Sequence, residues 1–315
     1  MKYKYGIIGC GGISNRFAGV LAQSETGEIH GAAARNPESA REFCAKHGGK
    51  PYADYDELIQ DTAVDVVYIG TVHSHHYDLV KQCLNRGKNV LCEKPLVLHA
   101  AQARELADLA RQQNCFLMEA MWTRCNPVVI EATRWVREGR IGKPVVVNAA
   151  FCSRNTYNPE GRIYNPALAG GALYDVGVYV IEFATGLLGE NPSEIHAAVT
   201  NADTGVDDYV SMALRFPSGA QASLQCGISA YVPHKASIHG TEGYIEFEPE
   251  FWKPKSCTLY QSKGEPIDTF SVEFEDGFCY QIDHVADMLN QGRIESTRIP
   301  WQDTIACAAV FDAIL

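Results

Sequence analysis

The chain has 315 residues, of which 46% are hydrophobic and 21% charged, and these values are ordinary for a globular protein with a sizeable core. This length suggests two domains of roughly 100 to 200 residues each. The 38 acidic residues against 27 Lys and Arg give a formal net charge of −11, which in the absence of a basic stripe opposes binding to nucleic acid or to an anionic membrane.

The sequence also bears on the compartment. No apolar run approaches the roughly 18 residues of a membrane span, and the N-terminus enters a strand-like run without a signal-peptide pattern. Eleven cysteines are scattered from Cys10 to Cys307 and never spaced as C-x-x-C, which favours buried thiols in a reducing compartment over disulfides, catalysis or metal binding. We therefore expect a cytoplasmic protein with no membrane partner.

The first part of the chain alternates strand and helix patterns. Near-continuous apolar strands that alternate with helices predict a Rossmann-like, doubly wound parallel sheet. The expected strands cover residues 3–9, 28–34, 65–70, 89–92 and 115–118, and the expected helices cover 13–21, a segment opened by Pro37, 54–60, 75–86 and 100–112.

The pattern changes near residue 122. Mostly strands are expected from 193 to 271, and these predict a C-terminal α+β domain with a large, mostly antiparallel open sheet. The division is therefore expected between domains 1–122 and 123–315. Strands are expected at 145–152, 194–200, 209–216, 221–229, 236–239 and 244–247, and helices after Pro127 and over 173–188, 280–291 and 302–315.

A glycine-rich turn joins the first strand to the first helix. Gly9 permits a tight turn, Gly11 lets the backbone approach a pyrophosphate, and free N–H groups at the helix N-terminus meet the phosphate charge. Ser14 stands where Gly or Ala is usual, and it is small enough for close packing of the helix. The βαβ context favours a dinucleotide site over a plain glycine turn, and its residues are Gly9, Gly11, Gly12, Ile13 and Ser14.

The end of the second strand bears on the choice between NAD and NADP. An NAD site has an acid there that binds the ribose 2′-hydroxyl, whereas this chain has Ala34, Arg35 and Asn36. Arg35 can pair with a 2′-phosphate through planar, charge-assisted hydrogen bonds. We therefore expect NADP, with NAD less favoured. A solvated surface arginine is the alternative.

Polar residues follow the strand over 65–70, at the carboxyl edge where ligands bind in parallel sheets. Thr71, His73 and His76 are expected to line the cofactor, while His75 is expected to face solvent. A metal site is not expected at these histidines, because no adjacent Asp, Glu or Cys completes a recognisable ligand set.

The strand over 89–92 ends in an acid, a base and a proline: Glu93, Lys94 and Pro95. Its end is expected beside the nicotinamide, so both charged residues count among the cofactor contacts. Alcohol oxidation needs a hydride acceptor and a group that removes the hydroxyl proton. Lys94 is the candidate for proton transfer, although an ordinary lysine, with a pKa of about 10.4, would need burial or nearby charge for that role.

These motifs and others further along resemble those of the Gfo/Idh/MocA oxidoreductase family. The similarity lies in Glu93-Lys94-Pro95 and in the segment from Gly171 to Tyr179. The branch of dimeric dihydrodiol dehydrogenase and NADP-dependent D-xylose dehydrogenase is the more similar one. Its pattern is recognisable at 71–73, 116–124, 204–208 and 240–243.

The resemblance implies roles for three residues. Lys94 matches the family's proton-transfer lysine, and Asp175 and Tyr179 match its second motif, in which many members have histidine at the place of the tyrosine. Tyr179 would be the acid/base or its close partner, with Lys94 supporting it by positive charge and Asp175 orienting the pair. Which of Lys94 and Tyr179 carries the proton stays open. The purely structural alternative is that Asp175 is an acid at a helix N-terminus and Tyr179 is a packed aromatic residue.

Trp122 and Arg124 follow the last Rossmann-like strand, and both are expected to face the nicotinamide or its pyrophosphate. Packing at a domain hinge is equally open for Trp122. The segment from Thr204 to Asp208 is expected to be a simple turn between strands.

Together these features predict an NADP-dependent oxidoreductase that transfers a hydride between the nicotinamide and a ring carbinol of a sugar, polyol or vicinal diol. The resemblance also implies a homodimer or higher homo-oligomer formed through the antiparallel sheet. One alternative is a family member that recycles its nicotinamide, as an oxidoreductase, epimerase or glycosidase. The other is a non-catalytic NADP-sensing protein, against which the intact motifs and the acidic charge argue.

Overall fold

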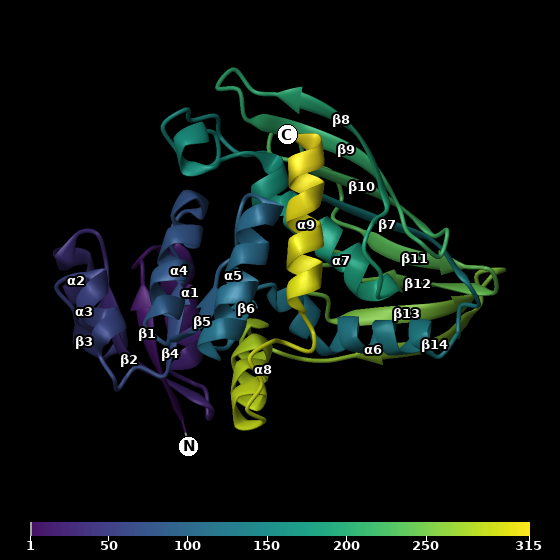
Figure 1. Ribbon diagram of the computed structural model, residues 1–315. Coiled ribbons are helices and arrows are strands. Elements are labelled where there is room, and N and C mark those ends of the chain that lie inside the picture. Colours follow the sequence, from purple (N-terminus) through teal and green to yellow (C-terminus); the bar gives the residue numbers. More distant parts are fainter. Residues whose placement is uncertain (1) are drawn as a thin grey trace. The chain divides into compact units, whose positions relative to one another are not determined.

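The computed structural model describes residues 2–315 (Figure 1). The chain forms two compact units. The first unit holds the residues up to Val97 together with Ala101–Ala120 and Phe278–Trp301, and the second unit holds Leu98–Ala100, Met121–Gly277 and Gln302–Leu315. The predicted division after residue 122 lies close to one of these boundaries. It differs from the units in that Phe278–Trp301 packs with the N-terminal part.

A six-stranded parallel sheet forms the centre of the first unit, in the order β3-β2-β1-β4-β5-β6. The strand order reverses between β1 and β4, and in such sheets ligands bind beside the carboxyl ends of the strands at that point. The prediction of a Rossmann-like sheet is thus confirmed. The strands are β1 (Tyr3–Ile8), β2 (Gly27–Ala33), β3 (Lys50–Pro51), β4 (Val66–Ile69), β5 (Asn89–Cys92) and β6 (Leu117–Glu119).

Helices join these strands. Two of them begin at a clear start signal: α2 at Pro37, which the capping side chain of Asn36 precedes, and α3 after the capping side chain of Asp54. The helices are α1 (Gly12–Leu21), α2 (Pro37–His47), α3 (Tyr55–Gln60), α4 (His76–Asn85) and α5 (Ala100–Gln113), and a 3₁₀ turn at His73–His75 precedes α4.

A late segment of the chain completes the first unit. Helix α8 (Phe278–Asn290) packs on α1, and its Asp283 accepts a hydrogen bond from Thr26 Oγ1 at 2.8 Å. The residues after α8 extend the contact to β6, because Leu117 N donates to Ile294 O at 3.0 Å. The parallel sheet therefore depends on a helix encoded more than 150 residues after its last strand.

The second unit contains an eight-stranded sheet in the order β14-β13-β12-β11-β7-β10-β9-β8. All neighbouring strands are antiparallel except β7 and β10, which run parallel, so the predicted mostly antiparallel sheet is confirmed. The strands are β7 (Pro144–Cys152), β8 (Glu194–Asn201), β9 (Asp207–Arg215), β10 (Gln221–Gly227), β11 (Ala236–Gly240), β12 (Gly243–Phe247), β13 (Ser256–Gln261) and β14 (Pro266–Ser271).

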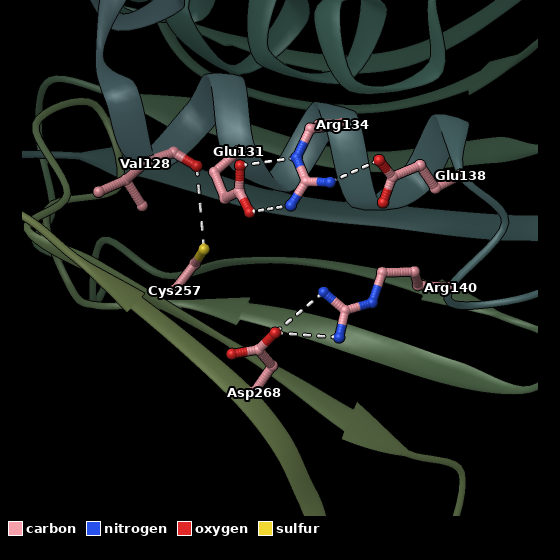
Figure 2. Close-up of polar contacts among 7 residues, drawn as sticks. All are labelled: Val128, Glu131, Arg134, Glu138, Arg140, Cys257 and Asp268. Atoms are coloured by element: carbon pink, nitrogen blue, oxygen red, sulfur yellow. Dashed lines mark hydrogen bonds and ion pairs between the residues drawn. The ribbon is translucent and has the colours of Figure 1, made fainter.

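Three helices belong to this unit: α6 (Pro127–Arg137), α7 (Val178–Leu188) and α9 (Trp301–Ile314). Helix α7 packs on β7 and β10, and α6 packs on β13 and β14. Figure 2 shows two contacts that hold α6 there. Cys257 Sγ lies 3.8 Å from the carbonyl oxygen of Val128. Arg140, just beyond the helix, places two side-chain nitrogens 3.0 Å from Asp268 Oδ2.

The opposite face of this sheet carries small polar side chains. Strand alternation turns Val147 and Ala149, both buried, toward the helices, and it turns Asn148 outward. Asn148 pairs in register with Ser223 of β10 and Ser237 of β11. A row of polar side chains therefore crosses these three middle strands.

One helical stretch of the described chain is long and apolar enough for a membrane span by length and composition, contrary to the sequence-based expectation. It covers Pro166–Leu188, and 83% of its apolar window is buried inside the fold. It contains a π-helical turn at Leu173–Gly177 that leads into α7. Such burial is typical of a core helix, and it explains why α7 is apolar all round.

Candidate active site

The glycine turn lies between β1 and α1, as predicted. Gly9 has φ of +89°, and its N–H donates to Ala33 O at 2.9 Å, which ties the turn to β2. A Cβ added to Gly9 would lie 2.9 Å from Thr71 Cγ2, so Thr71 packs against the turn. Ser14 is fully buried, and its Oγ fills the space that a Cβ on Gly70 would need. The serine thus permits close packing of helix and strand.

The N-terminus of α1 is suited to an anion. Asn36, Asp54 and Asn126 cap α2, α3 and α6 with their side chains, whereas α1 has neither a side-chain cap nor a first-turn acid among the residues described. Its first N–H groups lack intrahelical partners by geometry, and the helix dipole adds partial positive charge. A Cβ on Gly11 or Gly12 would meet no described atom within 4 Å. The residues of this turn therefore fit a pyrophosphate.

Arg35 is exposed in the loop between β2 and α2. Its backbone forms a hydrogen bond with the Tyr55 phenol. Burial raises the pKa of Tyr55, and this contact offsets part of that rise. The loop that carries Arg35 is thus held to α3, while the guanidinium lies at the surface beside the end of β2. This is the place that the sequence predicts for a cofactor phosphate contact.

The histidines after β4 differ in their surroundings. His75 is exposed, as expected, and His73 is 8% exposed. His76 is fully buried, with Nδ1 2.8 Å from Pro95 O and Nε2 3.2 Å from Thr71 O. Burial lowers the pKa of His76, and the contacts with the two carbonyl oxygens act in the opposite direction, because each carbonyl favours an N–H on the ring nitrogen that it faces. Its polar atoms hold two loops together, and any effect of His76 on a cofactor would act through these loops.

Glu93, Lys94 and Pro95 follow β5 at the same sheet edge as Thr71, because Cys92 pairs with Ile69 of β4. Glu93 is 5% exposed and accepts a hydrogen bond from the Tyr68 phenol at 2.7 Å, and burial raises its pKa. Lys94 is half-buried, and the Lys94–Pro95 peptide bond is cis. Both neighbours of Lys94 are held by side chains, since Glu93 is bound by Tyr68 and the carbonyl of Pro95 lies 2.8 Å from His76 Nδ1.

One acid that supports this loop was missed in the sequence. Glu119, at the end of β6, is buried, and its Oε1 accepts the N–H of Leu96 at 3.0 Å. The segment from Phe116 to Arg124 contributes to the family resemblance as a pattern, but the pattern does not indicate that its glutamate binds the backbone of another loop. That contact arises only because β5 and β6 are neighbours.

In the second unit, Tyr179 lies in the first turn of α7 and is 8% exposed. Trp122 Nε1 donates a hydrogen bond to its phenol oxygen at 3.0 Å. The ring of Phe151, near the end of β7, lies 5.3 Å from the Tyr179 ring and stacks on Trp252 at 3.8 Å with an interplanar angle of 9°. We call Trp122, Phe151, Tyr179 and Trp252 the aromatic cluster; its members come from four separate stretches of sequence.

Asp175 belongs to the π-helical turn that precedes Tyr179, and it forms an ion pair with Arg162 at 3.0 Å. The structure thus places Asp175 and Tyr179 four residues apart on consecutive helical turns of the second unit. Lys94 and the glycine turn belong to the first unit. The sequence pattern predicted Asp175 and Tyr179 as a pair, but Arg162 gave no recognisable signal.

Arg124 forms two ion pairs within the second unit. Its Nη1 lies 2.8 Å from Glu182 Oε2 and 2.7 Å from Asp303 Oδ2, and its side chain is 10% exposed. Glu182 follows Tyr179 by nearly one turn of α7, and Asp303 is in the first turn of α9. These contacts assign Arg124 to the framework that holds α7, because its charge is satisfied by two carboxylates.

Asp207 belongs to the pattern at 204–208, but that pattern does not indicate a structural role for its side chain. The segment around it was expected to be a simple turn, and a turn does form, since Gly205 N donates to Ala202 O at 2.9 Å. Asp207 itself starts β9, is 3% exposed, and accepts the N–H of Leu173 at 2.5 Å. Burial raises its pKa to about 7. The simple-turn prediction is therefore incomplete, because Asp207 anchors the start of the turn that carries Asp175.

Residues 2–315, which the structure describes, contain no group of three or more His, Cys, Asp or Glu side chains placed to hold an ion. The donors present around the glycine turn are backbone N–H groups and Arg35, which suit phosphate groups.

Comparison with known proteins matches both halves of the chain. Residues 3–121 match the model of an oxidoreductase family with an NAD-binding Rossmann fold, and residues 129–246 match the GFO/IDH/MocA C-terminal domain. The trans-1,2-dihydrobenzene-1,2-diol dehydrogenase of Xenopus tropicalis is 36% identical over 324 residues, covering 100% of this chain and 98% of that protein.

Solved structures agree with these matches. The crystal structure of aldose-aldose oxidoreductase from Caulobacter crescentus complexed with glycerol has a TM-score of 0.90 at 26% identity, covering 100% of this chain and 96% of that one. A 3-ketoreductase from Actinomadura kijaniata, in complex with NADP and TDP-benzene, has a TM-score of 0.87 at 26% identity, covering 100% and 97%. The chain therefore belongs to the Gfo/Idh/MocA oxidoreductase family, in the branch of the dihydrodiol dehydrogenases.

Proposed function

We propose that this protein is an NADP-dependent dehydrogenase that transfers a hydride between the nicotinamide and a ring carbinol of a vicinal diol or sugar. The observation that carries the proposal is the hydrogen bond from Trp122 Nε1 to the Tyr179 phenol at 3.0 Å, inside the aromatic cluster. A phenol that already has a donor on its oxygen is prepared to become a phenolate. The flat rings beside it suit a ring-shaped substrate.

The proposed cofactor is NADP. When bound, it supplies the hydride acceptor or donor. The uncapped N-terminus of α1, with Gly11 and Gly12, would hold the pyrophosphate, and exposed Arg35 would hold the 2′-phosphate. The relatives support the class of reaction: the Xenopus tropicalis enzyme is a diol dehydrogenase, and the Actinomadura kijaniata ketoreductase was crystallised with NADP.

The protein's own residues would manage the proton. We assign Tyr179 as the group that accepts the hydroxyl proton during oxidation and returns it during reduction. Lys94 would stabilise the phenolate by its positive charge. Asp175, held by Arg162, would keep the first turn of the helical segment in place for Tyr179. Because Lys94 and Tyr179 would titrate as a coupled pair, the pH dependence of the rate belongs to both.

The proposal extends to location and assembly. The eleven cysteines are thiols and not disulfides, which supports a reducing, cytoplasmic compartment. We further propose a homodimer that buries the polar face around Asn148, Ser223 and Ser237. Light scattering after gel filtration tests the dimer: replacing Asn148 by Arg, a long charged side chain at the centre of that face, should yield monomers, and an unchanged mass would refute this interface.

The activity is tested by following NADPH absorbance with NADP and a panel of aldoses, inositols and cyclic trans-diols. Turnover with a diol or sugar is expected for the wild type. The Tyr179→Phe variant should bind NADP normally but turn over about 100- to 10,000-fold more slowly, as expected for loss of an acid/base group. Tyr3→Phe, which removes a phenol at the first residue of β1, is the matched control. Cofactor binding without turnover of any compound would favour a recycling enzyme or a sensor instead.

A further inference from the structure

A cavity of about 700 Å³ lies within the second unit, and none of the roles above uses it. Its size falls in the range of roughly 300–1,000 Å³ that is usual for small-molecule sites. Three parts of the chain form it: the segment after β7, the turn between β8 and β9 with the start of β9, and the residue that follows Ile228 after β10. Its lining includes Arg154, Tyr157, Tyr164, Asn201, Asp203 and Asp208.

The lining alternates hydrogen-bond donors and acceptors. The Arg154 guanidinium and the Asn201 amide donate, and the Asp203 and Asp208 carboxylates accept. A hydroxyl group can satisfy both kinds of partner at once, because it donates and accepts. Two carboxylates against one guanidinium disfavour phosphates and other anions. The cavity therefore suits an uncharged compound with several hydroxyl groups.

One wall of the cavity is aromatic. The rings of Tyr157 and Tyr164 lie 4.9 Å apart in a T-shaped arrangement, and Tyr157 is 49% exposed. A phenol ring offers a flat apolar surface with a polar end. The C–H faces of a sugar ring can pack on such a surface while its hydroxyls reach the carboxylates. A cavity with one aromatic wall and polar groups around it therefore favours a saccharide ring over a small linear polyol.

The backbone of the cavity is held in place before a ligand arrives. Ile228 O accepts the N–H of Asn155 at 2.8 Å and the phenol of Tyr164 at 3.2 Å, so one carbonyl fixes two lining residues. Asp208 Oδ1 has no hydrogen-bond partner in the part of the chain that the structure describes. A buried carboxylate oxygen without a partner is costly, so a small donor such as a water that reaches it would stabilise it.

The same segment continues to the catalytic candidates of this unit. Arg162, two residues before Tyr164, pairs with Asp175 at 3.0 Å. Ile163 O accepts the N–H of Gly171 at 2.9 Å, at the start of the helical stretch that carries Asp175. A ligand seated against Tyr164 would therefore act on a segment that directly holds Asp175.

We propose that this cavity binds a saccharide ring, as a second sugar unit of the substrate beyond the ring that is oxidised. The assignment to the substrate rests on the proposed function, whereas the saccharide binding itself does not. Saccharides of two units should thus be better substrates than the matching single sugars. A cyclic diol without further hydroxyls should not use the cavity at all.

Binding is tested without cofactor. Saturation-transfer NMR and calorimetry would be carried out on the intact chain with glucose, xylose, cellobiose and maltose, and with trans-cyclohexane-1,2-diol as the non-sugar probe. At least one disaccharide should bind. Asp203→Ala and Arg154→Ala should each weaken that binding about tenfold, the usual effect of losing a hydrogen bond to a charged group. Glu265→Ala, an exposed acid between β13 and β14, serves as the matched control and should leave binding unchanged.

Kinetics then separates the two proposals. Asp203→Ala should raise KM for the disaccharide about tenfold and leave kcat and KM for the cyclic diol as in the wild type. If no compound is oxidised but disaccharide binding still depends on Asp203 and Arg154, the cavity assignment stands and the proposed function fails. If the diol or a single sugar is oxidised while no disaccharide binds, or binding ignores both substitutions, the cavity assignment is overturned and the proposed function stands.

Discussion

The carboxylate of Asp207 accepts the backbone N–H of Leu173 at 2.5 Å across 34 residues of sequence. This contact joins the first residue of β9 to the π-helical turn from which Asp175 projects and α7 continues. A Cβ on Gly171 would collide with Asp207 Oδ1, so the acid packs directly against the backbone before the turn. The position of Asp175 therefore depends on an acid that the sequence does not mark.

The first prediction concerns the pH dependence of folding stability. Burial raises the pKa of Asp207 from 3.8, the ordinary value of an aspartate side chain, to about 7. Because the folded state then binds the proton more tightly than the unfolded state, protonation stabilises the fold. This stabilisation is complete at pH values below the pKa of the unfolded state, and it is lost as the pH rises through the pKa of the folded state. Between about pH 4 and pH 7 this contribution should fall by up to about 4 kcal/mol, at 1.36 kcal/mol for each pKa unit.

The Asp207→Asn variant removes this titration. Urea unfolding at several pH values should show a flatter dependence in the variant than in the wild type across that interval. Asp78→Asn, an exposed acid on α4, provides the matched control and should follow the wild-type curve. Wild-type and Asp207→Asn curves that run parallel from pH 4 to pH 8 would show that Asp207 does not titrate in this interval.

The second prediction concerns cofactor choice. Arg35→Asp replaces a cation suited to the 2′-phosphate with an acid suited to a 2′-hydroxyl. KM for NADP should rise about 10- to 100-fold, as expected for loss of a charge-assisted bond, while KM for NAD should fall. Arg86→Asp changes the charge equally at another exposed site and should leave the ratio of the two KM values unaltered. An unchanged preference in Arg35→Asp would remove Arg35 from the cofactor site.

The third prediction concerns the bond from Trp122 to Tyr179. A donor on the phenol oxygen favours the phenolate, so Trp122→Phe should shift the pH profile of kcat toward higher pH and lower kcat about tenfold near neutrality. Turnover at high pH should recover toward the wild-type value. A uniform loss at every pH would instead mean that Trp122 only fills space.

The fourth prediction separates stability from cofactor binding at Arg124. Its guanidinium joins Glu182 of α7 to Asp303 of α9, with side-chain exposures of 10%, 0% and 16%. Arg124→Ala leaves the buried carboxylate of Glu182 and the partly buried carboxylate of Asp303 without their cation, and it should lower the free energy of unfolding by about 3–5 kcal/mol. Calorimetric melting measures this loss. The affinity of the folded variant for NADP should equal that of the wild type, and a specific loss of affinity would restore the predicted cofactor contact.

Much of the architecture could be predicted because local patterns carry it. Val66–Ile69 is buried throughout, and such an apolar run between helices reads as a strand of a parallel sheet. The bounds of individual strands could not be predicted where the sequence is polar. Strand β14 is exposed over almost its whole length, so it lacks the alternation of apolar and polar residues that indicates a strand. The π-helical turn at Leu173–Gly177 was predicted as ordinary helix, since nothing in its composition requires the wider turn.

The candidate site shows the same limit. Gly9 and Lys94 could be proposed as site residues from their places at strand ends, and Ser14 from its place in the first turn of α1. The partners of Trp122 and Arg124 could not, because each contact joins residues more than 50 positions apart and depends on how α7 packs. The cavity lined by Arg154 and Asp203 is likewise assembled from distant turns.

The return of α8 to the parallel sheet has a consequence for protein engineering. Phe278 and Ile282 are buried, and the Phe278 ring lies 6.4 Å from that of Phe17 in α1. A gene fragment that stops at Ala120 would leave this apolar surface of α1 open to solvent and prone to aggregation. Exchange of nucleotide-binding halves between family members must therefore transplant two separate coding segments together, the second ending at Trp301.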